Sequence, residues 1–162
     1  MFRAISCVAT LCLLAACGGD DQDPACSYAD VGSMTVVATS DMSTEPTAEV
    51  HYMGHGHVAQ VAAGTGGYLW INVPETGDAG IYIQSEGAVE AFFHEGQETN
   101  LGEPSVHPDC GDVFPVYYEI PNMAAGTWHI QLKEATEASE VWIMAIPKTA
   151  DDSHSDHDHH HH

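Results

Sequence analysis

Short runs of β-branched and aromatic residues recur along this chain, and glycine, proline, aspartate or serine lies in nearly every gap between them. Such runs favour β-strands, and the residues in the gaps are typical of turns. No stretch free of these breakers keeps an apolar period of 3.6 residues for three turns, so no helix is predicted. The predicted strands are residues 34–39, 48–53, 57–62, 68–73, 80–84, 89–94, 116–120, 127–133 and 140–146.

Eight or nine short strands at close spacing predict an all-β domain, folded as an antiparallel β-sandwich or jelly roll. Side chains alternate along residues 127–133, so Trp128, Ile130 and Leu132 share one face of that strand. His129 falls on the opposite face, where we expect it to be exposed to solvent.

The last two predicted strands carry a recognisable pattern. Residues 125–132 read Ala-Gly-Thr-Trp-His-Ile-Gln-Leu, and residues 141–146 read Val-Trp-Ile-Met-Ala-Ile. This order of a glycine, an aromatic residue and alternating apolar residues resembles the closing hairpin of bacterial pre-peptidase C-terminal-type β-sandwich domains. The resemblance implies a sandwich fold and implies no chemistry.

Composition limits the partners of the protein. The 162 residues include 24 acidic and 3 basic side chains, which gives a formal net charge of −21. A field this negative repels nucleic-acid phosphates, so nucleic-acid binding is excluded. A hydrophobic content of 44% is normal for a folded protein, and the length suits one domain.

The N-terminus carries a targeting signal. A cationic start is followed by an apolar run, residues 4–16, that is too short to span a bilayer. The run ends in Leu-Ala-Ala-Cys at residues 14–17, which resembles the lipobox of bacterial lipoproteins. The resemblance implies that residues 1–16 are a signal peptide and that acylated Cys17 binds the lipid bilayer. Because Gly18 follows the cysteine, it also implies the outer membrane, facing the periplasm or the cell surface.

The alternative is an ordinary secretory signal in which Cys17 is incidental. In either case the sequence after the signal divides into three parts. Residues 17–25 are small, polar and acidic and form a flexible tether, residues 26–148 form the sandwich, and residues 149–162 form a disordered tail.

Two cysteines, Cys26 and Cys110, lie within the predicted domain. In an oxidising compartment such a pair indicates one disulfide. A thiolate metal site is the alternative, and it needs a reducing environment or a preformed pocket.

The segment at residues 51–57 is the most suggestive internal feature. His51, Met53, His55 and His57 occupy its odd positions, so an extended backbone would point all four side chains to one face. Imidazole suits zinc and copper(II), and a thioether shifts the preference toward copper(I). These four residues are therefore the predicted internal metal site, the alternative being a polar strand edge or loop.

Three isolated histidines are additional candidate ligands: His94, His107 and His129. His94 begins His-Glu-Gly-Gln-Glu, which lacks the second histidine and the helix of a zinc-protease motif. His107 is interpreted as a turn residue that a disulfide at Cys110 could fix in place.

The last twelve residues contain only aspartate, serine and histidine. Tracts of this kind bind zinc, copper or nickel through neutral imidazole, so binding should weaken as the pH falls. An appended purification tag is the alternative, although Asp158 interrupts the run of histidines. The predicted tail ligands are His154, His157, His159, His160, His161 and His162.

Together these features favour a membrane-anchored extracytoplasmic lipoprotein that binds copper or zinc for sequestration or delivery. One alternative is an envelope module that docks a protein or a glycan and binds metal incidentally. The other is a small metal-dependent enzyme in which His51, His55 and His57 hold the ion. We do not expect an enzyme and assign no catalytic residue, because no general base can be named.

Overall fold

The computed structural model describes residue 26, residues 34–137 and residues 139–148. These residues form nine strands, which confirms the all-β prediction. The strands are β1 (Met34–Val37), β2 (His57–Val61), β3 (Thr65–Val73), β4 (Gly77–Ile83), β5 (Val89–His94), β6 (Gln97–Thr99), β7 (Val116–Met123), β8 (Gly126–Ala135) and β9 (Ser139–Pro147). No helix in this part of the chain has the length and apolar character needed to cross a bilayer.

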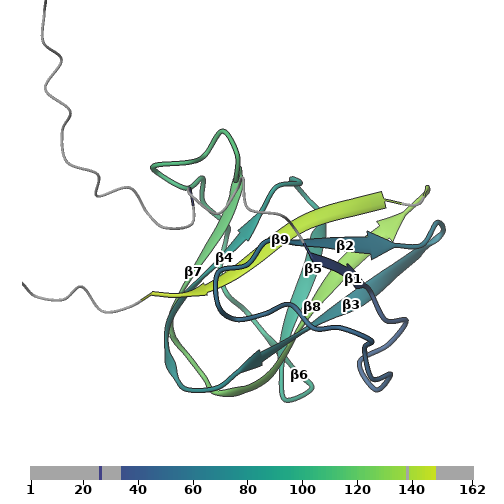
Figure 1. Ribbon diagram of the computed structural model, residues 1–162, viewed down its shortest axis with the longest axis horizontal. Coiled ribbons are helices and arrows are strands. Elements are labelled where there is room, and N and C mark those ends of the chain that lie inside the picture. The colour runs from purple at the N-terminus through teal and green to yellow at the C-terminus, as the bar shows by residue number, and fades with distance from the viewer. Residues whose placement is uncertain (1–25, 27–33, 138, 149–162) are drawn as a thin grey trace, which may run out of the picture.

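The strands form two sheets that enclose a shared core (Figure 1). Sheet A has the order β1-β2-β9-β4-β7, and sheet B has the order β3-β8-β5-β6. Every strand pair is antiparallel except β1 and β2, which are parallel. The predicted antiparallel sandwich is therefore confirmed, with this one parallel pair at the edge of sheet A. A parallel pair needs a long connection, and residues 38–56 supply it.

The prediction of a strand over residues 48–53 is wrong. Val50 forms an isolated bridge with Ile71 in sheet B, and Tyr52 forms one with Ala145 in sheet A. Because the segment passes from one sheet to the other within two residues, it cannot form a continuous ladder with either.

Strand β6 is the element that the sequence pattern missed. Glu95 and Gly96 join it to β5, and both have positive φ angles, 50° and 77°. Two consecutive residues of positive φ make the tight turn that best fits the twist of a hairpin. The glycine was visible in the sequence, but the short polar strand after it gives no hydrophobic signal.

The last two strands do not form the hairpin that the resemblance implied. Strand β8 lies in sheet B and β9 lies in sheet A. Both edges of β8 are already paired, with β3 on one side and β5 on the other, so β9 crosses to the opposite sheet. The predicted alternation is confirmed nonetheless, since Trp128, Ile130 and Leu132 are all buried in the core.

A second apolar cluster covers the outer face of sheet A. The loop between β6 and β7, which leads into β7 in Figure 1, brings Cys110 and Phe114 onto side chains of β4, β7 and β9. The buried members of this cluster are Tyr82, Cys110, Phe114, Tyr117 and Met144. Cys26 packs against the same cluster, so the two cysteines meet outside the main core.

Candidate metal centre

Cys26, His107 and Cys110 come together on the outer face of sheet A. Their potential ligand atoms, two sulfurs and one imidazole nitrogen, all lie within 4.8 Å of one another. Among the described residues this is the only group of three or more cysteine, histidine or acidic side chains that converges so closely. The two cysteines form the predicted disulfide, with their Cα atoms 5.5 Å apart and a sequence separation of 84.

A tight turn aims His107 at the sulfur. The backbone N–H groups of Val113 and Phe114 donate to the carbonyl oxygen of Cys110, at 3.0 and 2.9 Å. On the other side of the cysteine, the Asp109 N–H donates to Nδ1 of His107 at 3.3 Å. Sγ of Cys110 lies 3.3 Å from the same nitrogen. Nδ1 of His107 therefore faces both the Asp109 N–H and the sulfur of Cys110.

Aromatic side chains enclose this histidine. Its ring centroid lies 5.2 Å from that of Tyr82 and 4.8 Å from that of Tyr117. His107 is only 3% exposed and Cys110 only 8%, whereas Cys26 is half-buried. The sequence placed His107 beside a turn but gave no sign of its burial, because Tyr82 and Tyr117 come from β4 and β7.

This donor set has a defined chemistry. Two cysteine sulfurs and one imidazole are ligands that zinc and copper(I) accept, and three protein ligands leave a coordination position open. The thiolate is the form of cysteine that binds a metal. Metal binding at this centre therefore requires the two sulfurs to be separate thiolates.

The histidines at residues 51–57 lie near one another without forming such a centre. The ring centroids of His51 and His55 are 6.4 Å apart, and those of His51 and His57 are 5.3 Å apart. A turn at Met53 and Gly54 interrupts the extended backbone that the sequence suggested. Met53, with an exposed fraction of 76%, points into solvent.

His57 faces the interior. It begins β2, whose alternate residues enter the core, and it is 0% exposed. Its Nε2 accepts a hydrogen bond of 3.2 Å from the His51 backbone N–H. Burial first, and then the neighbouring His51, lower the pKa of His57, while the backbone of His55 acts in the opposite direction. One of the four predicted ligands is thus buried, whereas His51, Met53 and His55 are exposed.

The remaining body histidines, His94 on β5 and His129 on β8, lie on sheet B. His94 stacks on Trp128 at a centroid distance of 4.8 Å, and its Nε2 lies 3.0 Å from the Ala125 carbonyl oxygen. His129 is 5% exposed, which corrects the expectation that it faces solvent. The Trp70 ring packs against it at a centroid distance of 4.6 Å, and Phe93 is its register partner on β5.

Several predicted features lie outside the described residues: the signal peptide at residues 1–16, the lipidated Cys17 with its tether at residues 17–25, and the tail at residues 149–162 with its six histidines.

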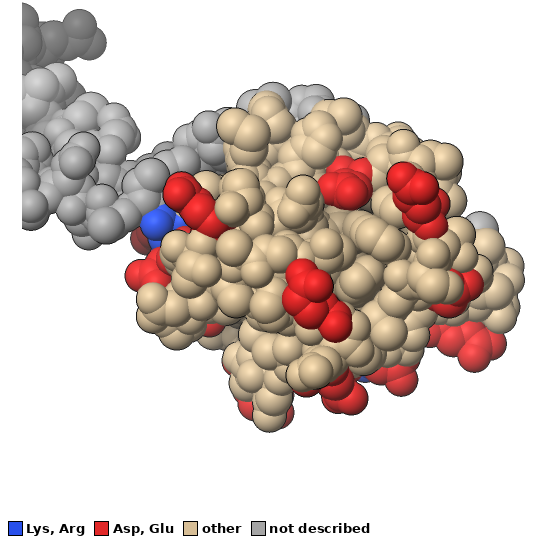
Figure 2. Space-filling view, turned by 90° about the horizontal axis from the view of Figure 1, so that it is seen from below, with Lys and Arg blue, Asp and Glu red and all other residues tan. Residues whose placement is uncertain are grey.

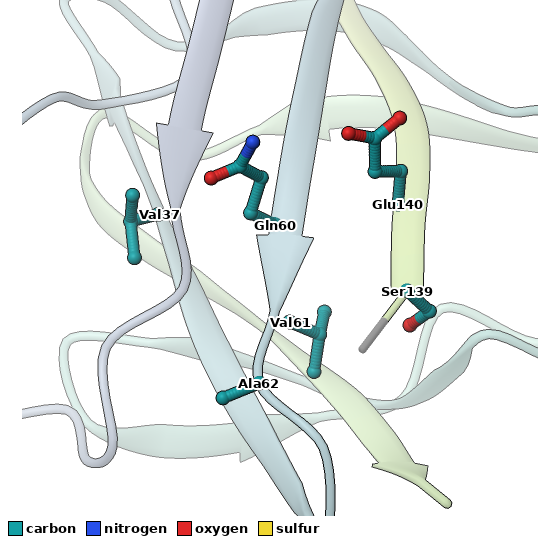
Figure 3. Close-up of a pocket in the computed structure, with 6 residues that line it drawn as sticks. All are labelled: Val37, Gln60, Val61, Ala62, Ser139 and Glu140. Atoms are coloured by element: carbon teal, nitrogen blue, oxygen red, sulfur yellow. The ribbon is translucent and has the colours of Figure 1, made fainter. Parts of the chain in front are cut away.

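An open hollow of about 530 Å³ lies between the ends of β1 and β2 and the start of β9 (Figure 3). Its lining residues are Val37, Gln60, Val61, Ala62, Ser139 and Glu140. Glu140 is the one lining side chain of a type that commonly binds metal, so the hollow does not extend the candidate centre.

The surface charge favours cations. Figure 2 shows acidic side chains spread over one face of the molecule rather than gathered in one patch. Lys148 forms an ion pair with Glu119 at 2.7 Å, which neutralises part of the small basic content. A net charge of −21 raises the local concentration of divalent cations around the whole protein.

A comparison with protein-family models gives no match for this chain, and a comparison with curated proteins gives none either.

Proposed function

We propose that this chain is a lipid-anchored protein of the cell envelope that binds copper or zinc for sequestration or delivery. The observation that supports it most directly is the convergence of Cys26, His107 and Cys110, with their ligand atoms within 4.8 Å of one another. Sulfur and imidazole are the donors that distinguish a zinc or copper(I) site from one for calcium or magnesium.

The surroundings suit an ion held by a rigid protein. Tyr82 and Tyr117 fix the His107 ring from two sides, and hydrogen bonds to its carbonyl oxygen fix Cys110. Donors that are already positioned lose less conformational freedom on binding than donors on a free chain. We therefore expect this centre to bind more tightly and exchange more slowly than the histidine-rich tail.

The envelope location rests on the sequence. The Leu-Ala-Ala-Cys motif at residues 14–17 supports acylation of Cys17, and acyl chains would hold the domain at a membrane. The acidic tether would then keep the domain close to the bilayer, where the tail and the acidic surface attract metal cations. In this proposal the tail captures ions and the domain retains one.

Metal binding can be tested on the full chain with its six tail histidines replaced by asparagine. After reduction by a dithiol and removal of the reductant, we expect about one zinc or copper(I) per chain by elemental analysis. His107→Ala should weaken binding by about tenfold or more, because it removes one of three ligands. His94→Ala is the matched control, since it removes another histidine packed on aromatic rings, and it should bind as the parent does. Absence of stoichiometric binding by the reduced parent would refute the proposal.

A further inference from the structure

We infer that metal binding at Cys26, His107 and Cys110 is controlled by thiol–disulfide exchange, and that the exchange begins at Cys26. This inference rests on the proposed metal-binding function. It assigns that centre two alternative states, a disulfide without metal and a dithiolate with metal.

The two states exclude each other because they use the same sulfurs. In the disulfide, the sulfur of Cys26 is bonded to that of Cys110. A metal ligand must instead be a separate thiolate, so an ion can bind only after the bond between the sulfurs is broken. Oxidation of the bound form must correspondingly release the ion.

The structure makes the two sulfurs unequal. Cys110 is 8% exposed and lies within the cluster of Tyr82, Phe114 and Tyr117. Cys26 is half-buried at the margin of that cluster. Exchange depends on which sulfur an incoming thiolate can reach, and an approach to Cys110 is obstructed by packed side chains. Cys26 is therefore the sulfur that is attacked, and Cys110 is the sulfur that leaves.

The reaction needs a reductant, and a small dithiol supplies both electrons. Its first thiolate bonds to Cys26, and Cys110 departs with the electron pair of the broken bond. Its second thiol then displaces Cys26, so the reductant becomes a disulfide and the protein holds two thiols. Binding of Zn²⁺ releases the two thiol protons to solvent. In the reverse direction, a disulfide oxidant gains two electrons, becomes two thiols and frees the ion.

The donors should stay close after the bond is broken. The Cys110 carbonyl keeps its hydrogen bonds from Val113 and Phe114, and His107 keeps its aromatic neighbours. Cys26 retains its packing against the same cluster. The hydrogen bonds to Cys110 and the aromatic contacts of His107 do not use the disulfide itself, so we expect reduction to leave three donors near one position.

The control of metal binding by thiol–disulfide exchange can be tested on the reduced, zinc-loaded full chain with its tail histidines replaced by asparagine. Oxidised glutathione is added, zinc release is followed with a chelating dye, and free thiols are counted by mass spectrometry. We expect about one zinc released for every two thiols lost at Cys26 and Cys110, counted apart from the other three cysteines of the full chain. Zinc retained after both thiols are oxidised would overturn the inference while leaving metal binding itself intact. Failure of the reduced protein to bind zinc would refute both proposals.

The order of attack can be tested without any substitution at the centre. The disulfide form is treated with reduced glutathione, quenched with acid after a short time and digested for mass spectrometry. Mixed disulfide on Cys26 should exceed that on Cys110 by about tenfold or more, because access selects the sulfur. Equal amounts, or an excess on Cys110, would overturn the assignment of Cys26 as the entry point.

Discussion

At the scale of single residues, the positions of histidines were readable from the sequence but their burial was not. His129 lies on the outer face of its sheet, as the alternation predicted, yet it is buried and packs against the Trp70 ring. Both of its ring nitrogens are buried without a hydrogen-bond partner among the described residues. Burial lowers the pKa of His129 below its ordinary value, and Glu95 opposes that shift in part.

This burial predicts a loss of stability in acid. Below about pH 6.5 the unfolded chain binds a proton at His129 that the folded chain takes up only at lower pH. The free energy of unfolding should therefore be fully retained above pH 6.5 and decrease as the pH falls toward 5. His129→Phe removes the proton site, so this variant should lose less stability between pH 7 and pH 5 in urea unfolding.

The control for that measurement is His55→Phe, which replaces an exposed histidine and should follow the parent. Part of the acid loss should persist in His129→Phe, because burial also lowers the pKa of His57. A pH dependence identical in His129→Phe and the parent would contradict the assignment to His129.

At the scale of elements, close packing between a backbone segment and a neighbouring side chain allows only glycine at some positions. Gly56 directly precedes β2, and a Cβ atom at this position would overlap the indole ring of Trp142 on β9. The same segment leads from the exposed His55 to the buried His57, so only a residue without a side chain fits at this position.

Gly56→Ala should accordingly destabilise the protein by about 1–3 kcal/mol, because Trp142 must move out of its packed position. Urea unfolding measures the difference. Gly77→Ala is a matched control at the start of β4, where an added Cβ meets nothing within 4 Å. The control should change stability by less than about 1 kcal/mol. Equal effects of the two substitutions would show that the contact with Trp142 is unimportant.

The local sequence pattern predicts most of the strands, but tertiary contacts decide whether a given segment pairs as a strand. Eight of the nine observed strands correspond to predicted runs, because alternating apolar residues must be buried whatever the order of strands. The pattern at residues 48–53 predicted a strand equally well. This segment instead forms one isolated bridge with each sheet.

At the scale of the whole molecule, the disulfide connects the first described residue to the loop before β7. It closes a loop that spans most of the strands. A cross-link of this length restricts the unfolded chain far more than the folded one.

Replacing both cysteines by alanine should therefore lower the free energy of unfolding, by at most about 4–5 kcal/mol for a separation of 84 residues. Urea unfolding of the oxidised parent and the double variant measures the loss. The parent reduced with a dithiol in the presence of a metal chelator should lose a similar amount. A double variant as stable as the oxidised parent would contradict a structural contribution from this bond.

Only part of the candidate metal centre could be predicted from the sequence. The pairing of Cys26 with Cys110 was predicted from their number and the expected oxidising compartment, and the sequence places His107 three residues before Cys110. That Nδ1 of His107 approaches the sulfur within 3.3 Å depends on packing against side chains from two other strands. The sequence favoured a metal site at residues 51–57, because its spacing suggested an extended backbone. The structure has a turn at Met53 and Gly54 instead.

The amino-acid sequence alone determined the class of fold, the face of most strand residues, the excess of negative charge and the cysteine pair. These follow from local composition, since burial of apolar side chains and turn chemistry act over a few neighbouring residues. Only the tertiary structure decided which strands pair, that β8 and β9 lie in different sheets, and which histidine meets the two sulfurs. Such outcomes depend on contacts between residues far apart in the chain, where many arrangements satisfy the same local pattern and packing selects one.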